Sequence, residues 1–463
     1  MSYPVGAEVF DEAFEADGSV RPVYEDLFSR IDEGALATLH DSVQKDLAVK
    51  GVEFGPPHSR APFAVDAIPR LIPAADWAAL ERGLIQRVKA LNAFLADAYG
   101  ERRAVTAGVI REELISEAMH YEPQLAEAGV PVQAEIAGPD LVRGADGEFS
   151  VIEDNLRTPS GLTYAAVGRS VIDPALQSDT TRPRSPEPAF EYLAEALRAK
   201  DPTGTGDPAI AVLTDGPISN AWYEHQELAR RLGVPLVTPS ELRESDGRIV
   251  ATTNNGRFAV DVLYNRSSTE SLTQSGDRYT LLGEVIVGPL KDRTLAVLNS
   301  FGTGVADDKA LHCYVDDLIR FYLDEEPLLT NTRSYDLGNP DHFAETVDRL
   351  DELVIKPRWT FGGEDIIIGP RTAPDKLKEL EASVRKSPER FIAQEMVMLS
   401  QHPTVIGDEL SPRHVDLRPY VFTIGDEVKV APVALSRYAR NEGELIVSST
   451  RGGGAKDTWI LES

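Results

Sequence analysis

The stretch that decides the fold, residues 133–162, reads Q-A-E-I-A-G-P-D-L-V-R-G-A-D-G-E-F-S-V-I-E-D-N-L-R-T-P-S-G-L. Near its centre, Asp146 and Gly147 form an Asp-Gly pair, which is a strong signal for a two-residue β-hairpin turn. Glycine favours such a turn because it accepts the positive φ that the turn requires. We therefore expect the segments on either side of this pair to be antiparallel strands.

The expected hairpin brings acidic side chains together. If the pair is the turn, Arg143 faces Ser150 and Asp140 faces Glu153. Side chains alternate along a strand, so Asn155 lies on the same face as Glu153, one step along. Facing carboxylates repel each other, and a cation between them is the simplest explanation. A longer loop would make the contact between the two acids diagonal but keep them on one face. The alternative is a solvated hairpin with ordinary surface acids, and spacing alone leaves both interpretations open.

Composition limits what the chain can bind. Its 463 residues are enough for two or three domains, and contents of 42% hydrophobic and 26% charged residues are those of a soluble globular protein. The formal net charge of −28 argues against nucleic acid or an anionic membrane as a partner through a general basic surface. A local positive pocket for an anion remains compatible with this charge.

The cysteine content and the first residues of the chain indicate the cellular compartment in which the protein is expected. The single cysteine, Cys313, excludes an internal disulfide and any metal site with several cysteines. Its apolar surroundings, L-H-C-Y-V, indicate a buried packing residue rather than a nucleophile. The first residues contain no apolar signal core, and no run of about 18 apolar residues occurs, so we expect a cytoplasmic protein without a spanning helix.

The regions around the hairpin have different patterns. Residues 24–99 read as mostly helical, and a helical stripe is formed by Leu80, Leu84, Val88, Leu91 and Leu95. From about residue 208, strand candidates at 209–214, 233–237 and 260–264 alternate with a helix, which suggests a parallel sheet. The turn T-D-G-P-I-S-N is not G-x-G-x-x-G, so a dinucleotide site is not expected there. Glu224 and His225 on that helix are interpreted as structural rather than catalytic.

The last third of the chain contains a lysine motif that is typical of a phosphate-binding site. K-P-x-x-x-x-G-G begins at Lys356, at the end of a strand, and continues into the loop W-T-F-G-G-E-D. A lysine followed by a Gly-Gly hairpin can neutralise phosphates while backbone N–H groups lie over them, although such a hairpin is often only a turn. No G-x-x-x-x-G-K-[ST] occurs, so this is not a P-loop. Gln394 and Glu395 end a strand that suits an adenine edge, with the backbone of Val397 as a hinge.

Several motifs together resemble one known family. They are G-P-D-L-V (138–142), I-E-D-N-L-R-T-P-S-G (152–161), G-T-G-V-A-D-D-K (302–309), V-I-K-P (354–357), A-Q-E (393–395), H-V-D-L-R-P (414–419) and the G-G-G-A-K-D-T-W tail. The set resembles the circularly permuted ATP-grasp family, predicted carboxylate–amine ligases distantly related to glutathionylspermidine synthetase. The resemblance runs from about Leu80 to the end. The metal-bearing strands precede the lysine strands, as a permutation would produce.

The resemblance implies a fold and a domain division. The fold class is α/β (α+β), a circularly permuted ATP-grasp fold with an additional Rossmann-like parallel-sheet domain and an N-terminal helical region. The implied division is 1–125 for the helical region, 126–205 for the metal-bearing half of the core, 206–290 for the Rossmann-like domain and 291–463 for the lysine-bearing nucleotide half.

The resemblance also implies site residues. Lys309 and Lys356 would contact the nucleotide phosphates. The other nucleotide-binding residues would be Gly362, Gly363, Gln394, Glu395 and Val397. The Mg²⁺ ligands would be Asp140, Glu153 and Asn155, which agrees with the one-face argument, and their oxygens suit a hard cation, with Mn²⁺ also possible.

Two departures from the family pattern concern the substrate. The loop T-F-G-G-E-D carries Glu364 and Asp365, which would repel a triphosphate unless turned away or bound to a second cation. The arginine that synthetase relatives place two residues before the metal aspartate is Gly138 here. Another arginine would have to hold the acyl phosphate, and the candidates are Arg157, Arg418 and Arg437.

These expectations favour an ATP-dependent carboxylate–amine ligase that forms an amide through an acyl phosphate with Mg²⁺. Its partners would be a small-molecule carboxylate and an amine, without nucleic acid or membrane, and an oligomer is possible. A small-molecule phosphotransferase and a catalytically silent nucleotide-binding protein of the same fold are the alternatives. The altered glycine loop and Gly138 favour the silent protein.

Overall fold

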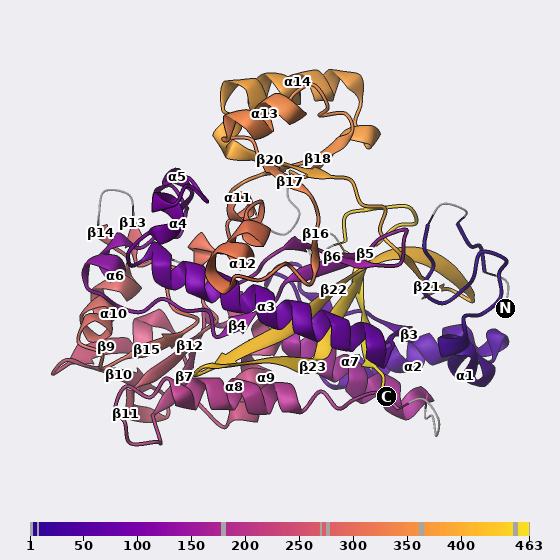
Figure 1. Cartoon of the computed structure of the whole chain (residues 1–463). Coiled ribbons are helices and arrows are strands. Elements are labelled where there is room, and N and C mark those ends of the chain that lie inside the picture. Colours follow the sequence, from indigo (N-terminus) through magenta and orange to yellow (C-terminus); the bar gives the residue numbers. More distant parts are fainter. Residues whose placement is uncertain are drawn as a thin grey trace.

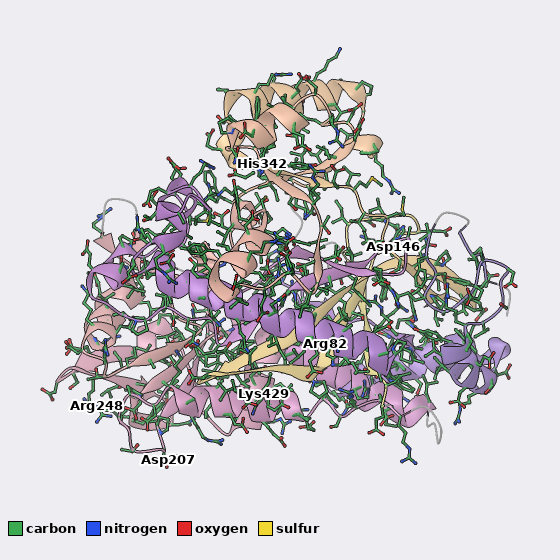
Figure 2. The ribbon with its side chains drawn as sticks, viewed as in Figure 1. Arg82, Asp146, Asp207, Arg248, His342 and Lys429 are labelled. Carbon is green, nitrogen blue, oxygen red and sulfur yellow. The ribbon has the colours of Figure 1, made fainter. Side chains whose placement is uncertain are left out.

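The computed structural model describes residues 3–6, 9–176, 182–268, 271–274, 278–360, 365–447 and 452–462. It is a mixed α/β structure, and Figure 1 shows a large lower body with a smaller unit above it. Charged side chains such as Arg82, Asp207 and Arg248 lie at the outer surface (Figure 2). No helix of the described part is long and apolar enough to cross a membrane.

The body is built on one large mixed sheet. Its strand order is β16 (Thr330–Asn331), β6 (Phe149–Glu153), β5 (Asp140–Arg143), β22 (Glu409–Ile424), β23 (Glu427–Tyr438), β24 (Gly454–Ile460) and β3 (Val65–Ile72), with β21 (Gln401–Ile406) and β4 (Ile136–Ala137) also pairing β22. β24 and β3 are parallel, and β22 is antiparallel to both β5 and β23. Early and late parts of the chain therefore share one sheet.

Helices cover both faces of this sheet. α3 (Ala74–Ala98) crosses one face in front of β22 and β23, whereas α7 (Leu162–Leu176) and α8 (Pro188–Ala199) pack against the other (Figure 1). The alternation of β22 explains this arrangement, because Leu417 and Val421 join the core under α3 while Tyr420 and Phe422 join the core under α7 and α8. The predicted apolar stripe of α3 is buried along its length. The N-terminal helices α1 (Pro22–Arg30) and α2 (Leu36–Val49) lie near β3.

One segment of the N-terminal region departs from the helical expectation. Residues 65–72 form β3, in which every residue is buried. A strand buried on both faces shows no alternation in its sequence, so periodicity does not reveal it. Its polar residues have buried partners, Asp66 with Lys456 at 2.6 Å and Arg70 with Glu12 at 2.6 Å. The register with β24 shifts beside Pro69, which cannot donate a ladder hydrogen bond.

A four-stranded parallel sheet forms a second part of the body. Its order is β15 (Ala296–Leu298), β12 (Val262–Asn265), β7 (Ile210–Leu213) and β8 (Leu236–Val237), with α9 (Trp222–Leu232) and α10 (Leu281–Lys291) among its connections. The parallel pairing predicted from the strand–helix alternation is confirmed. An antiparallel sheet that the sequence did not reveal is inserted, with strands β9 (Leu242–Ser245), β10 (Arg248–Thr253) and β11 (Gly256–Val260).

Glu224 is buried and accepts N–H bonds from Gly161 and Thr163 at the start of α7.

The smaller unit is a four-stranded sheet with its own core. The order is β17 (Ser334–Asp336), β20 (Phe391–Glu395), β18 (Leu353–Pro357) and β19 (Ile367–Ile368), and α13 (Pro340–Thr346) and α14 (Pro374–Lys386) cover its outer face (Figure 1). Leu353, Ile355, Ala393 and Leu380 belong to that core. Two short helices, α11 (Lys309–His312) and α12 (Val315–Leu323), lie between this unit and α3 (Figure 1).

Candidate nucleotide cleft

The β5–β6 hairpin places Asp140 opposite Glu153, as predicted, but the residues nearer the turn pair in a different register from the predicted one. Arg143 pairs with Phe149, not with Ser150, because the connection is longer than the Asp146-Gly147 pair. A bulge between Asp140 and Leu141 then restores the pairing of Asp140 with Glu153.

The extra residue of the bulge is Ile152, because Leu141 pairs with Val151. Its carbonyl oxygen lies 3.5 Å from Lys356 Nζ and 3.4 Å from Gln394 Nε2, both on the smaller sheet. The bulge at Ile152 therefore connects the β5–β6 hairpin to strands β18 and β20 of the smaller sheet.

A cleft between the large sheet and the smaller sheet collects most predicted site residues. It encloses about 1050 Å³, part of it open to solvent. Predicted residues among those lining it are Asp140, Glu153, Asn155, Lys356, Gln394, Glu395, Val397, Arg418 and Arg437. These residues come from strands more than 200 positions apart in the sequence, such as Lys356 and Ile152.

Asp140 is held by two arginines. Arg418 donates from Nε to Oδ1 at 2.6 Å and from its terminal nitrogen to Oδ2 at 2.6 Å, and Arg437 lies 3.0 Å from Oδ2. Burial acts to raise the pKa of the Asp140 carboxyl, but the two guanidinium charges outweigh it and lower the pKa to about 2. The carboxylate is therefore ionised at neutral pH.

Glu153 meets the lysines on the other side. Lys309, at the start of α11, has its Nζ 2.9 Å from Glu153 Oε1 and donates to the carbonyl of Thr360 at 2.7 Å. Burial acts to raise the pKa of Glu153, but Lys309 outweighs it and the pKa lies below its usual value. Lys356 donates to Gln394 Oε1 at 2.7 Å. Burial lowers the pKa of Lys356 to about 8, although Glu153 acts in the opposite direction.

Whether these groups suit a divalent cation depends on their free oxygens. Asn155 donates its amide nitrogen to the Gly138 carbonyl at 3.1 Å, so its amide oxygen is the atom suited to a cation. Asp140 and Glu153 are both paired with protein cations. Among the described residues, no group of three or more His, Cys, Asp or Glu side chains is placed to hold a metal. The oxygen set fits Mg²⁺ in kind, and a cation held by Asp140 must compete with Arg418 and Arg437 for its oxygens.

The other end of the cleft is apolar. Val354, Ile366 and Ile368 of the smaller unit line it, and so does the segment 445–447. The segment 396–399 leaves β20 beside them. Glu395 directs its carboxylate to the Tyr335 hydroxyl, which donates at 2.7 Å. Gln394 rather than the Glu395 side chain therefore points toward the lysine, and the backbone after Glu395 is left to contact a flat ligand.

Asp416 is a lining residue that sequence reasoning missed. It lies on β22 as the Cα partner of Arg437, whose terminal nitrogen is 2.6 Å from its carboxylate. Burial outweighs Arg437 and raises the pKa of Asp416 above its usual value. The D-L-R spacing of Asp416 and Arg418 places them on one face of a strand, and this signal could have identified it.

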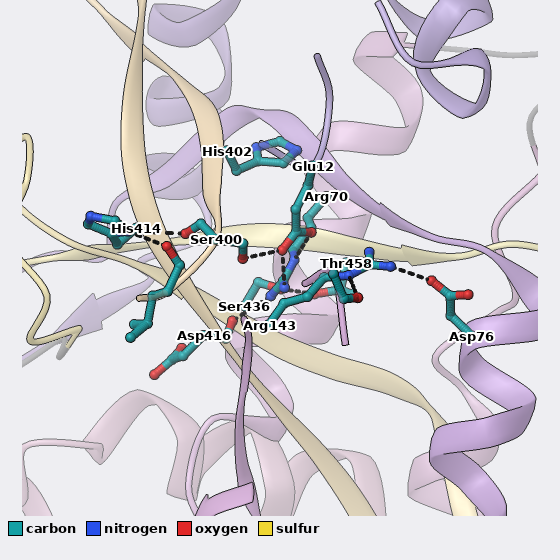
Figure 3. A network of polar contacts seen from close by, with 12 residues as sticks. Glu12, Arg70, Asp76, Arg143, Ser400, His402, His414, Asp416, Ser436 and Thr458 are labelled. Atoms are coloured by element: carbon teal, nitrogen blue, oxygen red, sulfur yellow. Dashed lines mark hydrogen bonds and ion pairs between the residues drawn. The ribbon is translucent and has the colours of Figure 1, made fainter. Parts of the chain in front are cut away.

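The part of strand β22 around Asp416 is held by a network of buried hydrogen bonds and an ion pair. Arg70 donates to the Asp416 carbonyl at 2.7 Å and to both oxygens of Glu12 at 2.6 and 2.7 Å. Ser400 donates to Glu12 at 2.5 Å, and Figure 3 shows these residues together. The Arg70 and Glu12 side chains are 0% and 1% exposed. The N-terminal segment thus supports, through Arg70, the strand that carries Asp416.

Removing one partner of this buried pair should destabilise the fold. We expect Glu12→Gln to lower the free energy of unfolding by about 3–5 kcal/mol, because Arg70 would remain charged and buried. Urea denaturation measures this change. The matched control is Glu15→Gln, whose side chain is 45% exposed in its ion pair with Arg21, and it should change stability by less than about 1 kcal/mol. Equal effects from both substitutions would contradict the role of the Glu12–Arg70 pair.

Arg157 does not line the cleft. Its Nε lies 2.5 Å from Asp307, it contacts His120 Nε2 at 2.9 Å, and it borders a separate small cavity near Asn265 and Asn299. Burial and Arg157 lower the pKa of His120 to about 3. Of the three candidate arginines, the structure brings Arg418 and Arg437 into the cleft.

Two further predictions concern glycine positions. Gly362 and Gly363 lie outside the described residues, next to Thr360, which Lys309 contacts. At Gly138, a Cβ would lie 2.8 Å from Pro159 Cβ and 3.3 Å from Arg418 Cδ. The side chain of Arg418 therefore passes close to the space that a residue at 138 would need.

A cleft between two β-sheets, with Lys356 on one wall and carboxylates on the other, is the arrangement expected of the ATP-grasp class. The family model "Circularly permuted ATP-grasp type 2" matches residues 69–439. The chain belongs to this family.

Similar proteins include both curated sequences and a solved structure. A protein of Frankia casuarinae named putative glutamate–cysteine ligase 2-2 is 40% identical over 97% of this chain and 53% of its own length. An uncharacterized protein of Mycobacterium tuberculosis is 37% identical over 99% of this chain and 85% of its own. The chain thus spans about half the length of the Frankia relative. A glutathione synthetase-like effector of Globodera pallida has a TM-score of 0.60 at 12% identity, covering 93% of this chain and 98% of the effector, which supports the fold alone.

Proposed function

We propose that this protein is an ATP-dependent carboxylate–amine ligase that forms an amide bond through an acyl phosphate. The observation that carries the proposal is that Lys356, Glu153 and Asp140 line one cleft, and that Lys309 reaches Glu153 from beside it, at 2.9 Å. The family and the name of the Frankia relative support a ligase. We further propose that residues 126–205 and 291–463 form the ATP-grasp core, and that 206–290 form a Rossmann-like unit beside it.

The cleft suggests how the chain would hold ATP. The apolar wall formed by the neighbouring residues Val354 and Ile368 would pack against the adenine, with the backbone from Glu395 to Val397 along its edge. The ammonium groups of Lys309 and Lys356 would neutralise the phosphates. The side chains of Asp140, Glu153 and Asn155 would hold Mg²⁺, which when bound neutralises charge that develops on the transferred phosphoryl group.

The chemistry needs a carboxylate brought next to the terminal phosphate. Arg418 and Arg437 would orient the carboxylate of the acid substrate and then hold its phosphorylated form. Lys356 would stabilise the negative charge of the transferred group. The amine substrate would then displace phosphate from the acyl carbon, and the walls of the cleft would keep water away from the acyl phosphate.

The pH dependence of nucleotide binding tests the role of Lys356. Its pKa of about 8 means that the ammonium loses its charge as pH rises through that value. We expect the affinity for a non-hydrolysable ATP analogue to fall as pH rises from 7 to 9.5, because the phosphates lose a cation. Calorimetric titration measures this. Lys356→Gln should bind weakly at all pH values in this range, and a wild-type affinity that does not change with pH would contradict the assignment.

A screen with pooled amino acids and polyamines tests the activity itself. Mass spectrometry should detect a product whose mass is the sum of an acid and an amine minus water, with ADP formed only when both are present. A substrate that gains the mass of a phosphate would instead identify a phosphotransferase. Nucleotide binding without turnover across the panel would identify a silent nucleotide-binding protein, an alternative favoured by the arginines that occupy Asp140.

A further inference from the structure

Asp140 is the residue at which the acidic and basic groups of the cleft meet. Its carboxylate accepts from Arg418 at both oxygens, at 2.6 Å each, and Arg437 lies 3.0 Å from one of them. The residue is 4% exposed, so the two guanidinium groups rather than bulk water stabilise the negative charge of its carboxylate. A divalent cation that binds these oxygens must therefore compete with the two arginines.

The two arginines are not equivalent. Arg437 is also held by Asp416, with Nε at 3.1 and 3.0 Å and a terminal nitrogen at 2.6 Å from the carboxylate oxygens. Arg418 has Asp140 as its only carboxylate partner among the described residues, and its remaining bond goes to the Ser160 carbonyl at 3.4 Å. Loss of Asp140 as a partner would leave Arg437 paired and Arg418 unpaired.

An unpaired Arg418 would be costly in this position. Its side chain is 12% exposed, and a largely buried charge without a counter-ion is strongly unfavourable. Arg418 lines the cleft, so its guanidinium lies within reach of an anion that enters there. An anion entering the cleft would restore the missing partner.

We propose that Arg418 is an exchange partner. It neutralises Asp140 until a divalent cation binds there, and it then holds the anionic group of the substrate, so that cation and anion bind cooperatively. Asp416 is a positioning residue that keeps Arg437 in place during the exchange. The proposal rests on the proposed function for the identity of the anion, a carboxylate or its phosphorylated form. It implies that the acid substrate and the metal each increase the affinity of the other.

Manganese binding to the full chain without nucleotide tests the exchange. The concentration of free Mn²⁺ is followed by electron paramagnetic resonance, with and without inorganic phosphate as the anion. We expect phosphate to tighten Mn²⁺ binding by about tenfold, within the usual range of coupling between two sites. In Arg418→Met, Mn²⁺ should bind about as tightly without phosphate as it does to the wild type with phosphate, and the effect of phosphate should largely disappear.

Two controls locate the effect. Asp140→Asn should weaken Mn²⁺ binding under both conditions, which separates the site from phosphate complexes of Mn²⁺ in solution. Arg248→Met makes the same change at an ion pair with Asp261 far from the cleft (Figure 2) and should behave as the wild type. Arg418→Gln is a second neutral variant in case the methionine variant does not fold, and thermal unfolding monitors both.

The outcomes separate this proposal from the ligase proposal. Equal Mn²⁺ affinity with and without phosphate in the wild type, or no Mn²⁺ binding at all, overturns the exchange whatever the variants do. Wild-type behaviour of both Arg418 variants overturns it as well. Coupling without any amide product contradicts the ligase proposal alone, whereas amide formation without coupling contradicts the exchange alone.

Discussion

Lys356→Met should reduce ADP formation by about 10²- to 10³-fold, the effect of removing one preorganised group from a developing negative charge. The ammonium lies 2.7 Å from Gln394 Oε1 and 3.5 Å from the Ile152 carbonyl, so it is positioned by both walls of the cleft. Methionine preserves much of the buried volume and removes the charge. A coupled assay for ADP with a saturating acid and amine measures the change.

The matched control is Lys456→Met. Lys456 is also a buried lysine, on strand β24 of the large sheet and 2.6 Å from Asp66 of the neighbouring strand β3, and it does not line the cleft. This variant should lose stability, because it leaves Asp66 buried without its cation. The fraction that remains folded should keep its turnover rate. Full ADP formation by folded Lys356→Met would show that the lysine does not act on the nucleotide.

Glu153→Gln should have the second largest effect, a loss of about 10²-fold or more in turnover together with weaker Mg²⁺ binding. Glu153 faces Asp140 across the hairpin and is 2.9 Å from Lys309. The amide keeps the shape of the side chain but removes the negative charge that a hard cation requires. The Mg²⁺ concentration for half-maximal rate should rise along with the loss in rate.

Glu148→Gln is the comparison for this substitution. Glu148 lies at the exposed turn of the same hairpin, so the change affects the charge of the hairpin without reaching the cleft. It should leave both the rate and the Mg²⁺ dependence close to those of the wild type. A Mg²⁺ dependence that does not change in Glu153→Gln would remove Glu153 from the metal site.

The sequence was informative where function depends on local spacing. The facing of Asp140 and Glu153 follows from a hairpin whose strands are adjacent in the chain, and a bulge corrected the error in turn length. The parallel strands after residue 208 were recognisable for the same reason, since short apolar strands alternate with a helix. The strand β3 was missed, because burial on both faces removes the period-2 pattern.

Contacts between distant parts of the chain could not be read from spacing. Arg418 contacts Asp140 although the two residues are 278 positions apart in the sequence. Arg157 and Arg418 are both arginines, and the sequence alone does not show which of them reaches the cleft. Asp416 was overlooked because its role depends on pairing with Arg437 on the neighbouring strand. The fold positions these groups, and only the packed sheet shows which arginine enters the cleft.

A crystal structure of the full chain with Mn²⁺ and a non-hydrolysable ATP analogue tests the central claim most directly. We predict an anomalous Mn²⁺ peak within coordination distance of oxygens of Asp140, Glu153 and Asn155, with Lys356 on the phosphates and the adenine packed against Val354 and Ile368. A nucleotide bound outside this cleft, or a Mn²⁺ peak beyond coordination distance of Glu153, would contradict the account.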